Sequence, residues 1–325
     1  MRAIALTEYG GPEVLRLSEV EDPVYGPEEV LIRIRAAGVN RADLLQREGR
    51  YPPPAPAPKV EIPGLECAGE VAAVGARVGL FRPGQRVAAL VPGGGYAEKV
   101  AVHERLVWSV PTGLSSTEAA AVPEAFLTAY DALTQQAGLT AGQWVLIHAA
   151  AGGVGSAAVQ LATWMGTHVV ATVGSDEKAA WVRGLGADYV VNYRQQTFLE
   201  VIRAYTPGMD AVLDFVGQTY WEDNLESLVP GGVLVVVGTL SGDRVQARLG
   251  VLLGRRLTVR GTALRSRPLE LRFALVQQFV RRVLPALAQG RLKPLVDATF
   301  PLSEAARAHA YMQENRVQGK IVLTV

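Results

Sequence analysis

The chain lacks features that several classes of protein need. Cys67 is the only cysteine among 325 residues, which excludes an internal disulfide and a cysteine-based zinc cluster. The 32 basic and 31 acidic side chains leave a net charge of +1, so we expect no nucleic acid as a partner. No apolar run reaches about 18 residues, so we expect no membrane span. The first residues contain no apolar leader core, and we therefore expect a cytoplasmic protein.

The sequence also lacks a serine-hydrolase motif and any clustering of its histidines. The sequence has no Gly-x-Ser-x-Gly elbow, which excludes a serine hydrolase of that type. The four histidines are scattered through predicted strands, a strand end and a terminal helix, and we expect each to be structural or solvated: His103, His148, His168 and His309.

The pattern of residues changes near position 121. Before it, short strands alternate with turns, and the proline-rich segment 51–64 is expected to form a stiff, exposed loop. After it, six strands alternate with helices, which is typical of a doubly wound parallel sheet. We expect these strands at 144–149, 168–173, 188–193, 209–217, 231–239 and 257–264. Two helices then follow, at 269–287 and 302–315, and a strand at 320–325 that we expect to return to the first domain.

A glycine-rich turn, HAAAGGVGSAAVQLA at 148–162, joins the first of these strands to a helix. In a dinucleotide-binding unit, three small residues permit the tight turn, the approach of the pyrophosphate and the packing of helix on strand. Ala150, Gly152 and Gly155 have this spacing. The first turn of the helix adds unpaired N–H groups and a partial positive charge. We therefore expect a nucleotide phosphate at Ala150, Ala151, Gly152, Gly153, Val154 and Gly155.

The end of the second strand distinguishes NADP from NAD. NAD sites usually have an acidic residue there that binds the ribose hydroxyl, whereas this chain has Gly174. Ser175 and Lys178 follow, and Tyr193 comes just after the third strand, within reach of the same pocket. These residues favour NADPH. Asp176 keeps NAD as the alternative, and Ser175 can instead be a helix cap.

Motifs along the whole chain include AAGVNRADLLQREGRYP, PGLECAGEVAAVG, VPGGGYAEKVAV, HAAAGGVGSAAVQLA and ENRVQGKIVLTV. In this order they resemble the medium-chain dehydrogenase/reductase superfamily, and within it the zinc-free quinone oxidoreductases related to zeta-crystallin. The resemblance implies an α/β protein with a GroES-like, β-rich catalytic domain at residues 1–122 and 265–325. A Rossmann NADP-binding domain with a six-stranded sheet, residues 123–264, is inserted between these parts.

The resemblance also bears on metal and substrate. Zinc-dependent relatives have a ligating cysteine where this chain has Asn40 and a histidine where it has Leu65, so we expect no zinc. Without a strong Lewis acid, the chemistry is directed toward quinones and activated enones. The resemblance places Asn40 and Tyr51 beside the substrate, with Tyr51 as a hydrogen-bond donor to a quinone oxygen. Asp43 matches an acidic position of the motif, and a role at a helix N-terminus is an equal alternative.

Five further residues are candidates for cofactor contacts. The resemblance implies Thr128 and Asn315. Val216, Leu240 and Leu264 lie at the ends of successive strands, where open α/β sheets hold ligands.

These observations predict an NADPH-dependent quinone reductase that works without metal. The alternatives are an NADPH-dependent enoyl or alkenal double-bond reductase and a non-catalytic NADPH-binding protein. The last strand of the inserted sheet, 257–264, contains no proline or lysine that would prevent edge pairing. The resemblance implies a homodimer in which two subunits pair these edges.

Overall fold

The computed structural model describes residues 1–51, 53 and 58–325. Residues 52 and 54–57 of the predicted proline-rich loop lie outside the described residues. The chain forms two compact units. We call residues 1–127 and 265–325 the split unit, and residues 128–264 the inserted unit.

The inserted unit contains a six-stranded parallel sheet with the order β10-β9-β8-β11-β12-β13, which confirms the predicted doubly wound arrangement. Its strands read as continuous apolar runs because helices cover both faces of the sheet. The strands are β8 (Trp144–Ile147), β9 (His168–Val173), β10 (Tyr189–Asn192), β11 (Met209–Asp214), β12 (Leu228–Val236) and β13 (Thr258–Gly261).

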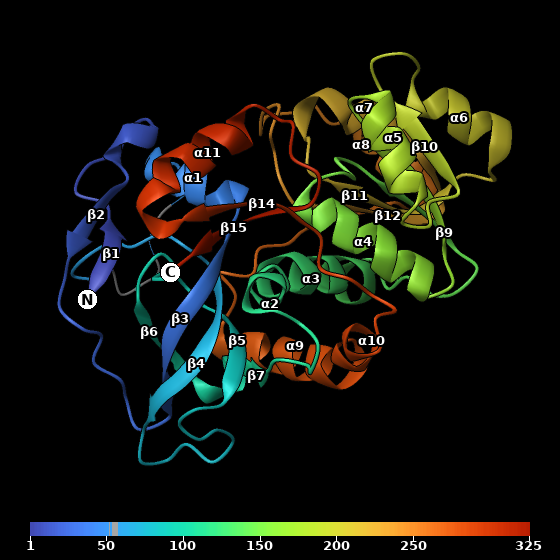
Figure 1. The fold of residues 1–325 in the computed structure, drawn as a ribbon. Helices are drawn as coiled ribbons and strands as arrows, with labels where there is room; N and C mark the ends of the chain where they lie inside the picture. Colours follow the sequence, from blue (N-terminus) through green and yellow to red (C-terminus); the bar gives the residue numbers. More distant parts are fainter. Residues whose placement is uncertain (52, 54–57) are drawn as a thin grey trace. The chain divides into compact units, whose positions relative to one another are not determined.

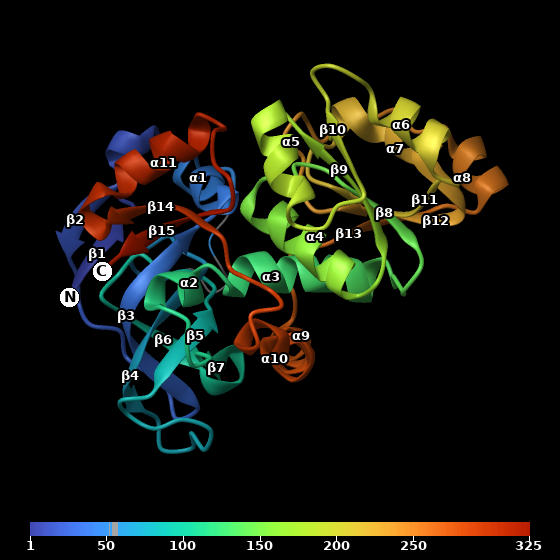
Figure 2. The same cartoon turned by 45° about the vertical axis from the view of Figure 1, so that its right-hand side comes forward.

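Helices alternate with these strands and pack on the two faces of the sheet. α4 and α5 cover one face, and α6 and α7 cover the other (Figure 2). The helices are α4 (Gly153–Trp164), α5 (Asp176–Arg183), α6 (Phe198–Tyr205), α7 (Trp221–Ser227) and α8 (Leu249–Arg255). A 3-10 turn, Gln218–Tyr220, precedes α7. Side chains of Leu146, Val170 and Val212 from the sheet meet Phe198 and Ile202 of α6 in the core.

The split unit is built on a sheet with the order β14-β15-β3-β4-β5-β7, in which β6 also pairs with β3 (Figure 1). β14 and β15 are parallel and the other pairs are antiparallel. The final strand therefore returns to the first part of the chain, as predicted. The strands are β3 (Glu29–Val39), β4 (Glu66–Val74), β5 (Arg86–Leu90), β6 (Lys99–His103), β7 (Val107–Ser109), β14 (Val296–Pro301) and β15 (Lys320–Thr324), with β1 (Arg2–Ala5) and β2 (Arg16–Glu19) in a separate antiparallel pair.

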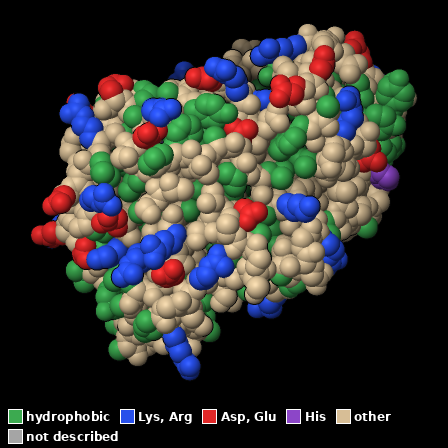
Figure 3. Space-filling view, viewed as in Figure 1, with side chains coloured by type: hydrophobic (Ala, Val, Ile, Leu, Met, Phe, Trp, Pro, Cys, Tyr) green, Lys and Arg blue, Asp and Glu red, His purple; other side chains and the backbone are tan. Residues whose placement is uncertain are grey.

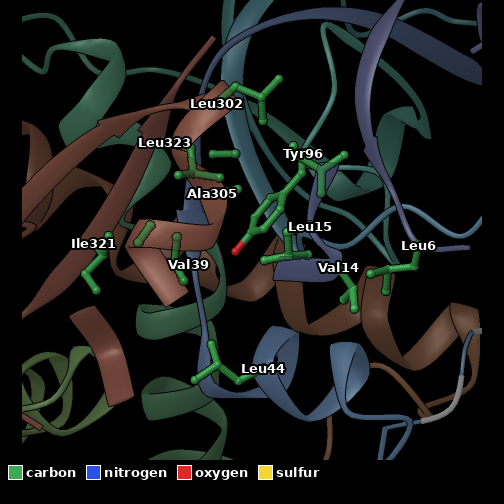
Figure 4. Packing of buried hydrophobic residues seen from close by; sticks show 13 residues of the cluster. Leu6, Val14, Leu15, Val39, Leu44, Tyr96, Leu302, Ala305, Ile321 and Leu323 are labelled. Carbon is green, nitrogen blue, oxygen red and sulfur yellow. The ribbon is translucent and has the colours of Figure 1, made fainter. Parts of the chain in front are cut away.

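Tyr96 stands among aliphatic side chains in a core to which two helices contribute, α1 (Arg41–Arg47) and α11 (Ala305–Gln313) (Figure 4). The unit also contains α2 (Ser116–Ala120), α9 (Leu269–Arg282) and α10 (Leu284–Ala288), with 3-10 turns at Pro12–Val14, Glu104–Leu106 and Leu302–Glu304. α3 (Pro123–Tyr130) starts in the split unit and continues past the unit boundary into a π-helical segment, Asp131–Gln136.

The helix predicted at 269–287 is two helices in the structure. α9 ends before Val283 and α10 begins at Leu284, with Pro285 in its first turn. Proline has no backbone N–H and clashes with the preceding turn, so one continuous helix is unfavourable there.

None of the helices in the described residues is both long and apolar enough to cross a membrane. On the face shown in Figure 3, basic and acidic side chains are interspersed.

Candidate functional site

The loop between β8 and α4 has the close backbone packing that the glycine spacing predicts. Ala149 adopts a left-handed conformation with φ 48°, and the N–H of Gly152 donates to its carbonyl at 2.9 Å. A Cβ on Gly155 would lie 2.3 Å from Ala149 O, so any side chain there would force the helix away from the strand. The sequence did not single out Ala149, because alanine carries no signal for a positive φ.

The start of α4 offers backbone donors that the protein leaves available. Gly152 is the N-cap and supplies no side-chain hydrogen bond, and the first turn contains no acidic residue. A helix of 12 residues therefore presents unsatisfied N–H groups and the positive end of its dipole. Elsewhere in the inserted unit, the buried hydroxyl of Thr128 has no hydrogen-bond partner among the described residues. These two features fit a dinucleotide, which supplies anionic oxygens and amide groups.

The end of β9 has no free carboxylate. Gly174 follows the strand, and a Cβ there would lie 2.5 Å from the hydroxyl of Tyr193. Ser175 is the N-cap of α5, accepting from the N–H of Lys178 at 3.2 Å. Asp176 accepts hydrogen bonds from Asn192 (2.9 Å) and from the side-chain amide of Gln195 (2.8 Å), and these bonds lower its pKa.

The other predicted cofactor residues of the inserted unit lie just beyond the ends of their strands. Leu240 is exposed, Leu264 is buried and Val216 is half-buried. A residue that the sequence did not reveal holds this region: Asp214 accepts from the N–H of Val216 at 2.7 Å and from that of Gly217 at 3.1 Å. Burial raises the pKa of Asp214.

In the split unit, Asp43 organises the start of α1. Its carboxylate accepts from the N–H of Asn40 at 2.8 Å, from the N–H of Gly64 at 3.2 Å and from the hydroxyl of Tyr96 at 3.1 Å. Of the two roles considered for Asp43, the structure shows the one at the helix N-terminus. Burial raises its pKa to about 6. The hydroxyl of Tyr96 also lies 3.1 Å from His309 Nε2.

Tyr51 stands beside a residue that the sequence analysis missed. The guanidinium carbon of Arg265 lies 4.9 Å from the centre of the Tyr51 ring, and Arg265 Nη1 donates to Gln46 Oε1 at 2.9 Å. Burial raises the pKa of Tyr51 to about 12, so its phenol keeps its proton at neutral pH. Burial and the charge of Glu66 raise the pKa of Glu124 to about 8. No local pattern in the sequence marked Arg265 or Glu124, because the residues that each interacts with are distant in the sequence.

The residues at the positions where zinc-dependent relatives have ligands do not fit a zinc ion. Leu65 has no ligand atom, and Asn40 and Glu66 hydrogen-bond to each other and to Lys320. Cys67 is buried, and burial raises the pKa of its thiol to about 12. Within residues 1–51, 53 and 58–325, no three His, Cys, Asp or Glu side chains form a group that could hold a metal ion.

Asn315, the last predicted cofactor residue, belongs to the split unit. It has φ 56° and accepts from Arg41 Nη2 at 3.0 Å. Of the four histidines, His148 is structural: its Nδ1 lies 2.9 Å from Thr172 Oγ1, and its Nε2 lies 2.7 Å from Asn224 Oδ1.

The doubly wound sheet and its glycine-rich loop place the protein among those with a Rossmann-type, dinucleotide-binding fold. Two family models match the chain: "Alcohol dehydrogenase GroES-like domain" over residues 26–112 and "Zinc-binding dehydrogenase" over residues 153–281. The quinone oxidoreductase of Pseudomonas aeruginosa is 35% identical over 99% of both chains, and the human quinone oxidoreductase is 32% identical over 98% of this chain and 94% of that protein. The Escherichia coli quinone oxidoreductase, solved in complex with NADPH, is 30% identical with a TM-score of 0.91 over 100% of both chains. The chain belongs to the quinone oxidoreductase family of the medium-chain dehydrogenase/reductase superfamily.

Proposed function

We propose that the protein is an NADPH-dependent quinone reductase that works without a metal ion. The proposal depends most on the residues that follow β9. Gly174 places no carboxylate against a ribose 2′-phosphate, and Asp176 is engaged by Asn192 and Gln195. Relatives named quinone oxidoreductase, one of them in complex with NADPH, support the same conclusion.

The inserted unit binds the cofactor, which supplies a hydride when bound. The first-turn amides of α4 hold the pyrophosphate, and Gly155 keeps this turn close to β8. Ser175, Lys178 and Tyr193 contact the 2′-phosphate. The hydroxyl of Thr128, which has no partner within the described part of the chain, bonds the nicotinamide amide. The remaining predicted contacts are Val216, Leu240, Leu264 and Asn315.

The split unit supplies hydrogen-bond donors to the quinone. Tyr51 and Asn40 donate to the oxygen on which negative charge develops as the ring is reduced. Tyr51 suits this role because its phenol stays protonated, and Arg265 stacks on its ring and orients it. Asn40 and Glu66 are bonded to the Lys320 ammonium rather than held free as metal ligands, which supports a step without metal.

The proposal is tested with a panel of benzoquinones, naphthoquinones and ortho-quinones, run with NADPH and NADH beside a set of enones. We expect the highest kcat/KM with NADPH and a quinone, unchanged after exhaustive chelation. Faster reduction of enones supports the double-bond reductase instead. NADPH binding with no acceptor reduced supports the non-catalytic alternative, and activity that disappears with a stoichiometric zinc contradicts metal independence.

We further propose that two copies of the chain pair through β13. This strand is the terminal strand of its sheet, and Val259 is 38% exposed. The preceding helix α8, which contacts β12, carries two exposed leucines, Leu249 (70%) and Leu253 (82%). Unpaired edges favour association, and a two-fold contact closes at the dimer. The proposed assembly is a homodimer.

A further inference from the structure

Three buried polar side chains meet where β3 ends: Asn40, Glu66 and Lys320, which are 8%, 0% and 4% exposed. Lys320 Nζ lies 2.5 Å from Glu66 Oε1, 2.6 Å from Asn40 Oδ1 and 2.9 Å from Val39 O. An ammonium has three N–H donors, and here each has its own acceptor. The charge of Lys320 is therefore fully hydrogen-bonded inside the unit.

Two glycines make room for this arrangement. A Cβ on Gly38 would lie 2.2 Å from Glu66 Oε1, so only glycine lets the carboxylate lie against β3. Gly319 has φ 98°, and a Cβ there would lie 2.4 Å from Leu295 O. The turn at Gly319 leads directly into β15, whose pairing of Ile321 with Val39 brings Lys320 to the end of β3.

The cluster fixes the orientation of the Asn40 amide. Lys320 only donates, so the Asn40 atom that faces it is the oxygen; Glu66 as a carboxylate only accepts, so the atom 2.8 Å from Glu66 Oε1 is the amide nitrogen. Glu66 is held in turn by the N–H of Glu124, which donates to its second oxygen at 2.8 Å. One N–H of Asn40 remains after these contacts. Hydrogen bonding of a cation to the amide oxygen polarises the amide and strengthens this N–H as a donor.

We propose that the Lys320–Glu66 ion pair positions Asn40, directing its remaining amide N–H at the quinone oxygen. The inference rests on the proposed quinone reduction and adds to it two positioning residues, Lys320 and Glu66. A buried ion pair is not needed for stability alone, because replacing both partners by neutral side chains of similar size is often tolerated. The pair therefore has a measurable role beyond folding if the neutral double variant folds but loses catalysis.

The test compares K320M with the double variant E66Q/K320M. K320M leaves Glu66 buried without its partner, so its Tm falls. The double variant regains much of this Tm but keeps kcat/KM for the quinone about 100-fold below the unmodified protein, since a misplaced donor costs about this factor. The KM for NADPH stays unchanged in both. K99M, which removes a half-buried lysine paired with Asp22, is the matched control and keeps full activity. A double variant that regains Tm and kcat/KM together overturns the proposal.

A second variant keeps the charge. In K320R the guanidinium still pairs with Glu66, but its planar fork cannot donate from one atom to three acceptors. We expect a folded protein with reduced kcat/KM, and full activity in K320R contradicts the inference. The side-chain amide resonances of Asn40, recorded without substrate or cofactor, shift in K320R and E66Q/K320M if the pair positions the amide. This signal tests the positioning even if the unmodified protein reduces no quinone, in which case the proposed function fails by itself.

Discussion

The hydroxyl of Tyr193 lies 2.5 Å from the point where a Cβ on Gly174 would stand. Glycine thus lets a phenol from the end of β10 occupy space at the end of β9, where NAD enzymes have a carboxylate. A side chain at Gly174 must displace Tyr193, and both the charge and the shape of this edge would then change.

Gly174→Asp is expected to reverse the cofactor preference. A carboxylate at this position repels the 2′-phosphate and displaces Tyr193. We expect this to weaken the binding of NADPH by about 1.5–3 kcal/mol. Dissociation constants of NADPH and NADH, measured by titration, check this. Gly174→Ala is the control, since it moves Tyr193 without adding charge and weakens NADPH less. Equal affinity of the unmodified protein for the two cofactors contradicts the assignment.

Gly155→Ala is expected to destabilise the inserted unit and to weaken NADPH binding together. The new Cβ would lie 2.3 Å from Ala149 O and 2.7 Å from Ala150 Cα, and overpacking of this kind costs about 1–3 kcal/mol. Gly152→Ala is the comparison, because its Cβ meets only Ala149 O at 3.3 Å and should cost less stability. Urea unfolding and cofactor titration measure the two effects, and a stable Gly155→Ala protein with full affinity would show that the loop tolerates a wider turn.

Tyr51→Phe removes a donor to the quinone oxygen while keeping the ring under Arg265. Loss of one such donor typically lowers kcat by about 10²–10³-fold, and we expect a loss of this size with little change in Tm. Steady-state rates with a naphthoquinone check the prediction. Tyr25→Phe, at an exposed tyrosine of the same unit, serves as the control. An unchanged kcat in Tyr51→Phe removes Tyr51 from the proposed mechanism.

His148 is expected to make the folded state sensitive to acid. Burial lowers its pKa from 6.5 to about 4, so the folded state binds fewer protons than the unfolded state below pH 6.5. Its contribution is present above pH 6.5 and is lost as the pH falls toward 4, amounting to about 3 kcal/mol. Asp43 and Glu124, whose pKa values are raised, contribute with the opposite sign but are common to the variants compared.

The measurement is the free energy of unfolding at a series of pH values between 4 and 7 for His148→Gln and the unmodified protein. The variant should be less stable at pH 7 but should lose less stability toward pH 4. His168→Gln, at a side chain that is 47% exposed, is the comparison for replacing a histidine outside the core. An identical slope in His148→Gln and the unmodified protein would contradict the role of His148.

Val259→Pro tests the dimer. Proline removes a backbone donor from β13 and is disfavoured in a paired strand, so the variant should give monomers or insoluble protein. Light scattering of the unmodified protein should give twice the chain mass of 34.7 kDa at micromolar concentration. A monomeric mass refutes the dimer, whereas a Val259→Pro dimer keeps the assembly but rejects this interface.

Much of the inserted unit could be predicted from the sequence, because its signals are local. The spacing of Ala150, Gly152 and Gly155 indicates a tight backbone turn within six residues. The continuous apolar strands indicate that helices cover both faces of the sheet. The resemblance to a known family added two candidate substrate contacts, Asn40 and Tyr51. The break of the predicted helix at Pro285 also had a local signal, which the pattern of apolar residues concealed.

By itself, then, the sequence determined the order of elements, the phosphate loop and the absence of an acid at Gly174, because turn geometry and hydrophobic period depend on neighbours along the chain. The tertiary structure decided the rest. Lys320 meets Asn40 and Glu66 only because β15 and β4 both pair with β3, and Arg265 reaches Tyr51 across more than two hundred residues. The partner of a buried charge depends on strand register and packing, which no local pattern encodes.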